Sequence, residues 1–314
     1  MQAGNWGVTN AFGNLKTVLM HRPGQELGVV TASTLREFNF DDPVDIDQFQ
    51  DDYETMVGLF HNHGVETVFL TDVLADDKDS LDYISHRPNM TYTRDLARVF
   101  SKGAVLMGPA LRGRWGDQHI VGRALKKLGI PLLGEISCPS FLEGGGVTVI
   151  GTDTVVASIC DRANQSGTAA LRDLTLGRVA NYFLEVPLPF GHIHIDGLFL
   201  ILGETLAICH LESLDVFPCR LYEANSQSYR HVMFTDYLRE RAIDIIPITT
   251  EEMRRGDLNV VVTCQGSKAI GFSSATRLAA EMAKRGWQLD TFPQEILFKG
   301  NGGAHCMTCP IHVV

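Results

Sequence analysis

The sequence lacks a long hydrophobic run and lacks a surplus of positive charge. No apolar stretch in its 314 residues approaches the length of a transmembrane helix. It has 27 Lys and Arg against 37 Asp and Glu, and the resulting net charge of −10 argues against nucleic acid as a partner. We therefore expect neither a membrane nor a nucleic acid partner, and the negative charge is compatible with a small cationic substrate.

A disulfide framework and a secretory signal are also missing. The seven cysteines are odd in number and irregular in spacing, which favours a reducing compartment. The opening residues, MQAGNW, contain neither a basic n-region nor an apolar h-region. Together these features predict a cytoplasmic protein.

No Pro-, Gly- or Ser-rich linker divides the chain. Apolar residues make up 45% of it and charged residues 20%, which is ordinary for a globular protein long enough to bury a substantial core. We therefore expect a single catalytic domain over residues 1–314. The sequence leaves open whether this domain forms a homo-oligomer.

A pattern of strand, polar loop, helix, glycine and strand recurs along the chain. Its first copy has a predicted strand at 15–20, a helix at 46–61 with apolar residues at helical spacing, and a strand at 65–70. Further helices are predicted at 117–128, 168–179, 228–241 and 274–285, each between strands, the last preceded by a strand at 259–263. A β-β-α-β unit of this size cannot bury its own apolar faces, so we expect five such units to pack around a common axis.

Polar residues gather at the junctions between these units. The segment RPNMTYTRD contains Asn89 and Asp95, and by itself it is typical of a turn with side-chain hydrogen bonds. Glu143 is followed by three glycines, and alone it would most simply be a surface or capping residue. Neither segment identifies a function when taken separately.

A third polar segment contains the pattern HxHxD. Alternation along a strand would place His192, His194 and Asp196 on one face. Metal ligands, a general acid or base beside a carboxylate, and structural polar residues all remain open for this pattern.

The segment NGGAHCMTCPI, from Asn301 onward, stands near the end of the chain. Its glycine pair allows close approach of the backbone to a ligand, and Cys306 beside His305 is a candidate thiolate nucleophile. Cys306 and Cys309 also form a CxxC. A zinc site is disfavoured because no second CxxC or ligand-spaced histidine pair accompanies it, and a redox dithiol is disfavoured because the motif follows a Gly-rich loop.

Taken together and in order, these motifs resemble those of the guanidino-group-modifying enzymes, the pentein superfamily. PNMTYTRD, FLEGG, HIHID and GGAHCMTCPI look most like the motifs of arginine deiminase, with dimethylargininase and the amidinotransferases as relatives. The resemblance covers nearly the whole chain. It implies an α/β fold of the pentein type, a five-bladed α/β propeller of β-β-α-β units around a pseudo-five-fold axis.

The resemblance also implies a cysteine-dependent hydrolase that cleaves a C–N bond of a guanidine compound through a covalent S-amidino intermediate. Cys306 would attack the guanidinium carbon, and His194 would protonate the departing amine and then activate water. Asp95 and Asp196 would hold the guanidinium nitrogens, and Glu143 would assist by hydrogen bonding. No metal or organic cofactor is implied. An amidinotransferase remains the alternative, and a catalytically silent binding protein is disfavoured because all five residues are present.

The match departs from arginine deiminase at the end that would hold the amino-acid part of the substrate. Asn89 and Arg162 match that pattern, but Asn301 stands where an arginine is usual. We group His305 with these three as candidate substrate-binding residues. The chain also has no room for the extra helical module of arginine deiminases. We therefore expect a small or substituted guanidine, or an arginine derivative, rather than free arginine.

Overall fold

The computed structural model describes residues 5–226 and 228–314, which form a mixed α/β fold with five separate sheets. Four sheets have three strands and one has five. In hydrogen-bonded order they are β17 (Cys309–Val313), β1 (Leu15–Met20) and β2 (Glu66–Phe69); β3 (Ala97–Phe100), β4 (Gly103–Leu106) and β5 (Leu132–Glu135); β6 (Val147–Ile150), β7 (Thr154–Ile159), β8 (Tyr182–Pro187), β11 (Cys219–Glu223) and β12 (Tyr229–Val232); β9 (Phe199–Gly203), β10 (Leu206–Cys209) and β13 (Asp244–Pro247); and β14 (Val261–Cys264), β15 (Lys268–Phe272) and β16 (Gln288–Phe292).

All five sheets contain the same arrangement of an antiparallel pair followed by a parallel strand. A parallel neighbour requires a crossover connection, and a helix supplies it each time. These helices are α2 (Ile46–Asn62), α5 (Asp117–Lys127), α6 (Gln165–Thr175), α8 (Phe234–Glu240) and α10 (Thr276–Ala283); the shorter helices are α1 (Leu35–Phe38), α3 (Leu70–Val73), α4 (Lys78–Ile84), α7 (Leu211–Leu214) and α9 (Thr250–Arg254). The predicted β-β-α-β repeat is therefore present in each sheet.

Helix α2 shows how the sequence specifies such a crossover. Asp45 caps it by accepting a hydrogen bond from the backbone nitrogen of Gln48. Its buried apolar face consists of residues three or four positions apart, namely Phe49, Tyr53, Met56, Val57 and Phe60. Helix α2 packs on β15 and β16, so it covers a neighbouring sheet as well as its own.

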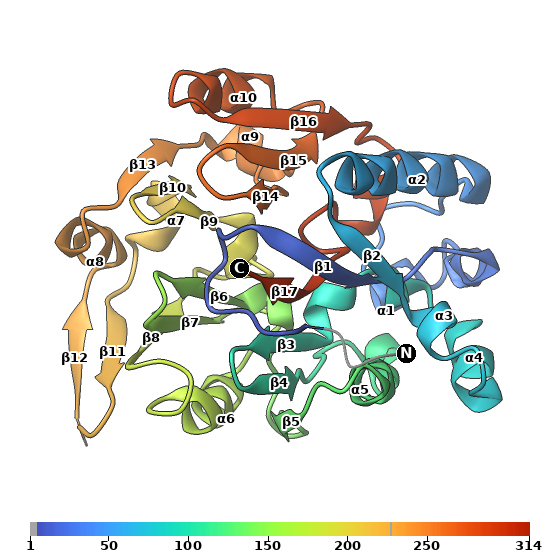
Figure 1. Cartoon of the computed structure of the whole chain (residues 1–314), viewed down its shortest axis with the longest axis horizontal. Coiled ribbons are helices and arrows are strands. Elements are labelled where there is room, and N and C mark those ends of the chain that lie inside the picture. The colour runs from blue at the N-terminus through green and yellow to red at the C-terminus, as the bar shows by residue number, and fades with distance from the viewer. Residues whose placement is uncertain (1–4, 227) are drawn as a thin grey trace.

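One strand of each sheet lies nearest the centre of the molecule: β17, β3, β6, β9 and β14 (Figure 1). Residues from all five of these strands line a single cavity. The mixed α/β class is confirmed, whereas the five-bladed propeller stays a prediction. No helix within the described ranges is both long and apolar enough to span a membrane.

Three differences between the structure and the sequence prediction bear on the sheets and the site. The helix predicted at 228–241 begins only at Phe234, because Tyr229–Val232 pairs with β11 as an exposed edge strand. The pattern HxHxD is not a strand: it leads into the short 3-10 helix η6 (Ile195–Gly197). The end of the chain forms β17, which pairs antiparallel with β1, a contact between chain ends that no local pattern indicates.

Candidate active site

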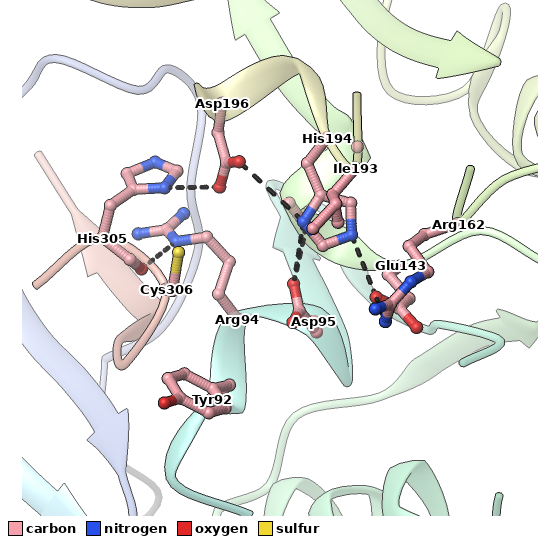
Figure 2. A network of polar contacts seen from close by, with 12 residues as sticks. Tyr92, Arg94, Asp95, Glu143, Arg162, Ile193, His194, Asp196, His305 and Cys306 are labelled. Carbon is pink, nitrogen blue, oxygen red and sulfur yellow. Dashed lines mark hydrogen bonds and ion pairs between the residues drawn. The ribbon is translucent and has the colours of Figure 1, made fainter. Parts of the chain in front are cut away.

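The candidate site residues lie on turns that immediately precede the central strands. Asp95 ends the 3-10 helix η3 (Thr93–Asp95) before β3, and Glu143 caps η5 (Gly144–Gly146) before β6. His194 immediately precedes η6 and Asp196 lies within it, before β9, and Cys306 lies in the turn before β17. Figure 2 shows how these four turns bring the side chains into one polar network.

His194 occupies the middle of this network. Its Nε2 lies 3.0 Å from Oε2 of Glu143, and its Nδ1 lies 3.8 Å from Oδ1 of Asp95 and 3.9 Å from Oδ1 of Asp196. Burial disfavours a charged ring, but the negative charge of Asp95 and the hydrogen bond with Glu143 outweigh it and raise the pKa of His194. The site therefore favours an imidazolium, which can donate a proton.

Glu143 is fully buried and held by several donors. Its Oε1 accepts a hydrogen bond from the backbone nitrogen of Ala110 at 3.0 Å, and Nη1 atoms of Arg114 and Arg162 each lie 3.6 Å from Oε2. Burial would raise its pKa, but the hydrogen bond with His194 and the charge of Arg114 lower the pKa of Glu143 to about 2. Glu143 is thus an ionised anchor for the imidazole.

Asp95 is fixed by a buried arginine and by the glycine turn. Arg114 Nη1 donates to its Oδ2 at 2.7 Å, and the backbone nitrogen of Gly145 donates to its Oδ1 at 3.1 Å. A Cβ on Gly145 would lie 2.5 Å from Nδ1 of His194. The second glycine of FLEGG is therefore required so that the imidazole can lie directly against this turn.

On the side of Asp196 away from His194 lies His305 (Figure 2). Nδ1 of His305 lies 2.8 Å from Oδ2 of Asp196. Burial and the positive charge of Arg94 lower the pKa of His305 to about 4, so its ring is neutral near pH 7. Although burial opposes it, the hydrogen bond that His305 donates lowers the pKa of Asp196 and keeps this carboxylate ionised.

The thiol of Cys306 faces these carboxylates. Its Sγ lies within 4.8 Å of a carboxylate oxygen of Asp196 and a ring nitrogen of His305. Desolvation and the negative charges of Asp196 and Asp95 raise the pKa of Cys306. The site therefore disfavours a free thiolate, and a cation bound among the carboxylates would make ionisation easier.

Asn259 is a site residue that sequence reasoning missed. Its Nδ2 donates to Sγ of Cys306 at 3.2 Å, and its Oδ1 accepts from the backbone nitrogens of His305 at 2.8 Å and Cys306 at 3.4 Å. It stands two residues before β14, as the other site residues stand before their strands. That shared position, within the strand predicted at 259–263, is the signal that could have identified it.

The glycine pair of the terminal motif makes room for aromatic side chains. A Cβ on Gly302 would lie 2.4 Å from the ring of Tyr92, and a Cβ on Gly303 would lie 2.3 Å from the ring of Phe272. The sequence interpretation, close approach to a ligand, does not describe these contacts. The pair instead lets the Cys306 turn pack against two rings.

Two cavities meet at Cys306, His194 and Asn301. The inner cavity, of about 40 Å³, is lined by polar residues that include Asn89, Asp95, Arg114, Glu143 and Arg162. The outer cavity, of about 230 Å³, is lined by residues that include His192, Met253, Arg254, Asn259 and Phe298. A planar group at their junction would touch the thiol, the imidazole and the carboxylates together.

The four candidate substrate-binding residues are placed differently from one another. Asn89 and Arg162 line the inner cavity, and Oδ1 of Asn89 is buried without a hydrogen-bond partner among the described residues. Asn301 lines both cavities, but its Nδ2 donates to the backbone oxygen of Asn39 and to Asp41. His305 lines neither; it lies behind Asp196 and borders the central cavity instead.

Two sets of three side chains have ligand atoms within 4.8 Å of one another: Asp95, Glu143 and His194, and Asp196, His305 and Cys306. His192 is in neither set, so the three residues of HxHxD do not converge on one point. Arg114 and Arg162 lie beside the first set, and their positive charges oppose a metal cation there.

Known proteins share this fold and resemble this sequence. The family model described as N,N dimethylarginine dimethylhydrolase, eukaryotic, matches residues 36–313. An arginine deiminase of Mycolicibacterium gilvum (strain PYR-GCK) is 20% identical over 400 aligned positions, which cover 97% of each protein.

Two solved structures are similar at low sequence identity. DDAH from Pseudomonas aeruginosa, complexed with citrulline, matches with a TM-score of 0.70 and 15% identity over 94% of this chain and 99% of its own. An amidinotransferase from Microseira wollei, of the saxitoxin biosynthetic pathway, matches with a TM-score of 0.74 and 13% identity over 98% of this chain and 97% of its own.

The fold and these matches define a guanidino-group-modifying enzyme of the pentein superfamily. Within that superfamily, the chain belongs to the N,N dimethylarginine dimethylhydrolase family, eukaryotic, whose model covers most of its length.

Proposed function

We propose that this protein is a cysteine-dependent hydrolase that cleaves a C–N bond of a guanidine compound through a covalent S-amidino intermediate. The observation that carries the proposal is the convergence of the Cys306 thiol, the His194 imidazole and the Asp95 and Asp196 carboxylates at the junction of two cavities. A guanidinium is planar and cationic, and carboxylates match its N–H groups in geometry and charge.

A bound cation would also make it easier for the Cys306 thiol to ionise. Burial and the negative charges of Asp196 and Asp95 together raise the pKa of Cys306. A guanidinium held by Asp95 and Asp196 would offset their charge, so the thiol proton passes to solvent when substrate arrives. Reactivity would then be confined to the occupied site.

In the proposed reaction, the Cys306 thiolate attacks the guanidinium carbon. His194, whose pKa is raised, gives its proton to the departing amine as the C–N bond breaks, and the carbon stays on sulfur as an S-amidino group. Water then adds to that carbon while His194 takes one of its protons. The C–S bond breaks as the hydroxyl proton of the adduct passes to solvent, which releases a urea-type product and the thiolate, and Glu143 holds the imidazole throughout.

The inner cavity supports a substrate with an anionic tail. Arg114 lines it together with Arg162 and Asn89, so a second cation lies in this cavity although Asn301 stands where an arginine is usual. Two guanidinium groups suit a carboxylate. We therefore propose an arginine derivative as the substrate class, with the leaving substituent directed to the outer cavity, and we assign His305 to positioning Asp196 rather than to direct substrate contact.

The same site could pass the amidino group to an amine, as an amidinotransferase does. The outer cavity of about 230 Å³ adjoins Cys306, and either water or an acceptor amine could approach through it. Hydrolysis is supported by the family match and by the arginine deiminase relative. A catalytically silent binding role stays disfavoured because every proposed catalytic residue is present.

We also propose that residues 1–314 act as one catalytic domain built as a five-bladed propeller. Each of the five sheets repeats the same unit. In each sheet a residue of the site lies just before the strand that is nearest the centre of the molecule. A construction of this kind assembles one site from five separate turns.

A guanidine panel with mass-spectrometric product analysis tests the proposal. Methylated arginines, arginine, agmatine and small guanidines would each be incubated with and without an acceptor amine. We expect ureido products from arginine derivatives without acceptor, and weaker turnover of agmatine, which lacks the carboxylate. Product that forms only with an acceptor would establish a transferase, and turnover of small guanidines alone would contradict the anionic-tail assignment.

A further inference from the structure

A third cavity, the central cavity, lies at the centre of the molecule, apart from the two cavities that contain Cys306. It has a volume of about 40 Å³, and strands β1, β3, β6, β9, β14 and β17 all contribute to its wall. Most of its lining is aliphatic, yet two arginines, Arg94 and Arg98, border it. A space of this size exceeds the 10–15 Å³ or so that one water needs.

Both arginines are buried, with exposed fractions of 4% for Arg94 and 7% for Arg98. Arg94 is occupied: its Nε donates to the backbone oxygen of His305, and its Nη2 donates to Oγ1 of Thr308 at 3.2 Å. The Nε of Arg98 is buried without a hydrogen-bond partner in residues 5–226 and 228–314. Nε of Arg98 is therefore a buried donor that makes no hydrogen bond to the described residues.

The charges around Arg98 make its position more unfavourable. Within the described chain no carboxylate forms an ion pair with it, and burial together with repulsion by Arg94 outweighs the more distant attraction of Asp196 and lowers the pKa of Arg98 to about 9. A buried charge ordinarily has a partner of opposite sign. At neutral pH the guanidinium charges of Arg94 and Arg98 thus border one small cavity. Among the described residues neither forms an ion pair with a carboxylate.

We propose that the central cavity is a binding site for a small, weakly hydrated monovalent anion such as chloride, held by the guanidinium of Arg98 and balancing the charge of Arg94. The volume admits an anion of this size with a few waters. The hydroxyl of Thr148, which also lines the cavity, is available as a further donor. A guanidinium is itself weakly hydrated, and the aliphatic walls disfavour a strongly hydrated divalent anion such as phosphate.

The site would stabilise the turn that contains Cys306. Arg94 holds this turn through the carbonyl of His305, and its backbone nitrogen donates to the carbonyl of Cys306 at 3.3 Å. An anion that balances the positive charges of Arg94 and Arg98 would therefore stabilise these two contacts between Arg94 and the Cys306 turn. The ligand and the cavity differ from those of the proposed reaction, so this inference stands independently of it.

Thermal unfolding at constant ionic strength tests the proposal. Sodium chloride or bromide would replace sodium gluconate, whose bulky anion does not fit the cavity. We expect Tm to rise by roughly 2–4 °C at 0.2 M halide, with phosphate much less effective. In Arg98→Met the halide effect should vanish, and in gluconate this variant should be at least as stable as the natural protein, because an unpaired buried charge is gone.

A matched variant and a direct measurement separate this site from the catalytic one. Arg162→Met removes a cation from the inner catalytic cavity and should keep the halide response. Crystals grown in bromide should show an anomalous peak in contact with Arg98. A halide response unchanged in Arg98→Met or lost in Arg162→Met would overturn the proposal. So would the lack of any halide-specific stabilisation, or bromide peaks only outside the central cavity.

Discussion

Asn259→Asp is expected to suppress the reactivity of Cys306 while preserving the turn that carries it. The substitution keeps Oδ1, which accepts hydrogen bonds from the backbone nitrogens of His305 and Cys306. It removes only the Nδ2 donor, 3.2 Å from Sγ, and adds a negative charge at that distance. The local geometry is thus retained, and the electrostatics of the thiolate change.

The magnitude follows from these contacts. A hydrogen bond to a charged group contributes about 1.5–3 kcal/mol, which corresponds to a roughly 10- to 150-fold change in rate. Two like charges about 4 Å apart repel by about 4 kcal/mol at an effective dielectric constant near 20. Because the new carboxyl can avoid part of that repulsion by taking up a proton, we expect kcat/KM to fall by about 100-fold or more. The rate constant for alkylation of Cys306 by iodoacetamide at fixed pH should fall in parallel.

A matched control distinguishes this effect from general damage. Asn164→Asp makes the same chemical change at an asparagine whose Oδ1 also accepts hydrogen bonds from backbone nitrogens, those of Phe141 and Gly167, and which lines neither catalytic cavity. It should leave both rate constants unchanged. If Asn259→Asp kept the alkylation rate and kcat/KM of the natural protein, Asn259 would not stabilise the thiolate and the reasoning would be refuted.

Three further predictions concern Cys306, Cys309 and His305. Cys306→Ala should abolish turnover without lowering Tm, because the thiol is the proposed nucleophile; measurable turnover by that variant would exclude the mechanism. Cys309→Ala should keep full activity and lose about 1 kcal/mol in denaturant unfolding, because this buried thiol only donates to the carbonyl of Ala97; activity loss equal to that of the Cys306 variant would revive a dithiol function. In the unfolded chain the His305 ring takes up a proton below about pH 6.5, whereas in the folded protein its pKa is about 4. The free energy of unfolding should therefore fall by about 2 kcal/mol as the pH is lowered from 6.5 to 5. The decline should be smaller in His305→Asn, and equal pH dependence of the two proteins would show that the ring is not held neutral.

Much of the fold could be predicted because its elements are encoded locally. The apolar spacing of α2, its Asp45 cap and the short apolar runs of the strands depend on neighbouring residues, and their predicted bounds agree with the structure to within a few residues. The prediction was wrong where local signals are ambiguous. Tyr229–Val232 is mostly exposed and shows no apolar alternation, so only its pairing with β11 makes it a strand.

The amino-acid sequence was enough to identify the chemical groups and to place them at the junctions between the repeated units, since motifs such as FLEGG are contiguous. How these groups act on one another depends on the folded chain. Asn259 becomes part of the site because its turn lies beside that of Cys306, and Arg114 becomes the direct hydrogen-bond partner of Asp95. Nε of Arg98 is left without a partner among the described residues because several sheets enclose it. Distance, burial and the pKa shifts that follow from them depend on residues remote in sequence, and no local pattern contains that information.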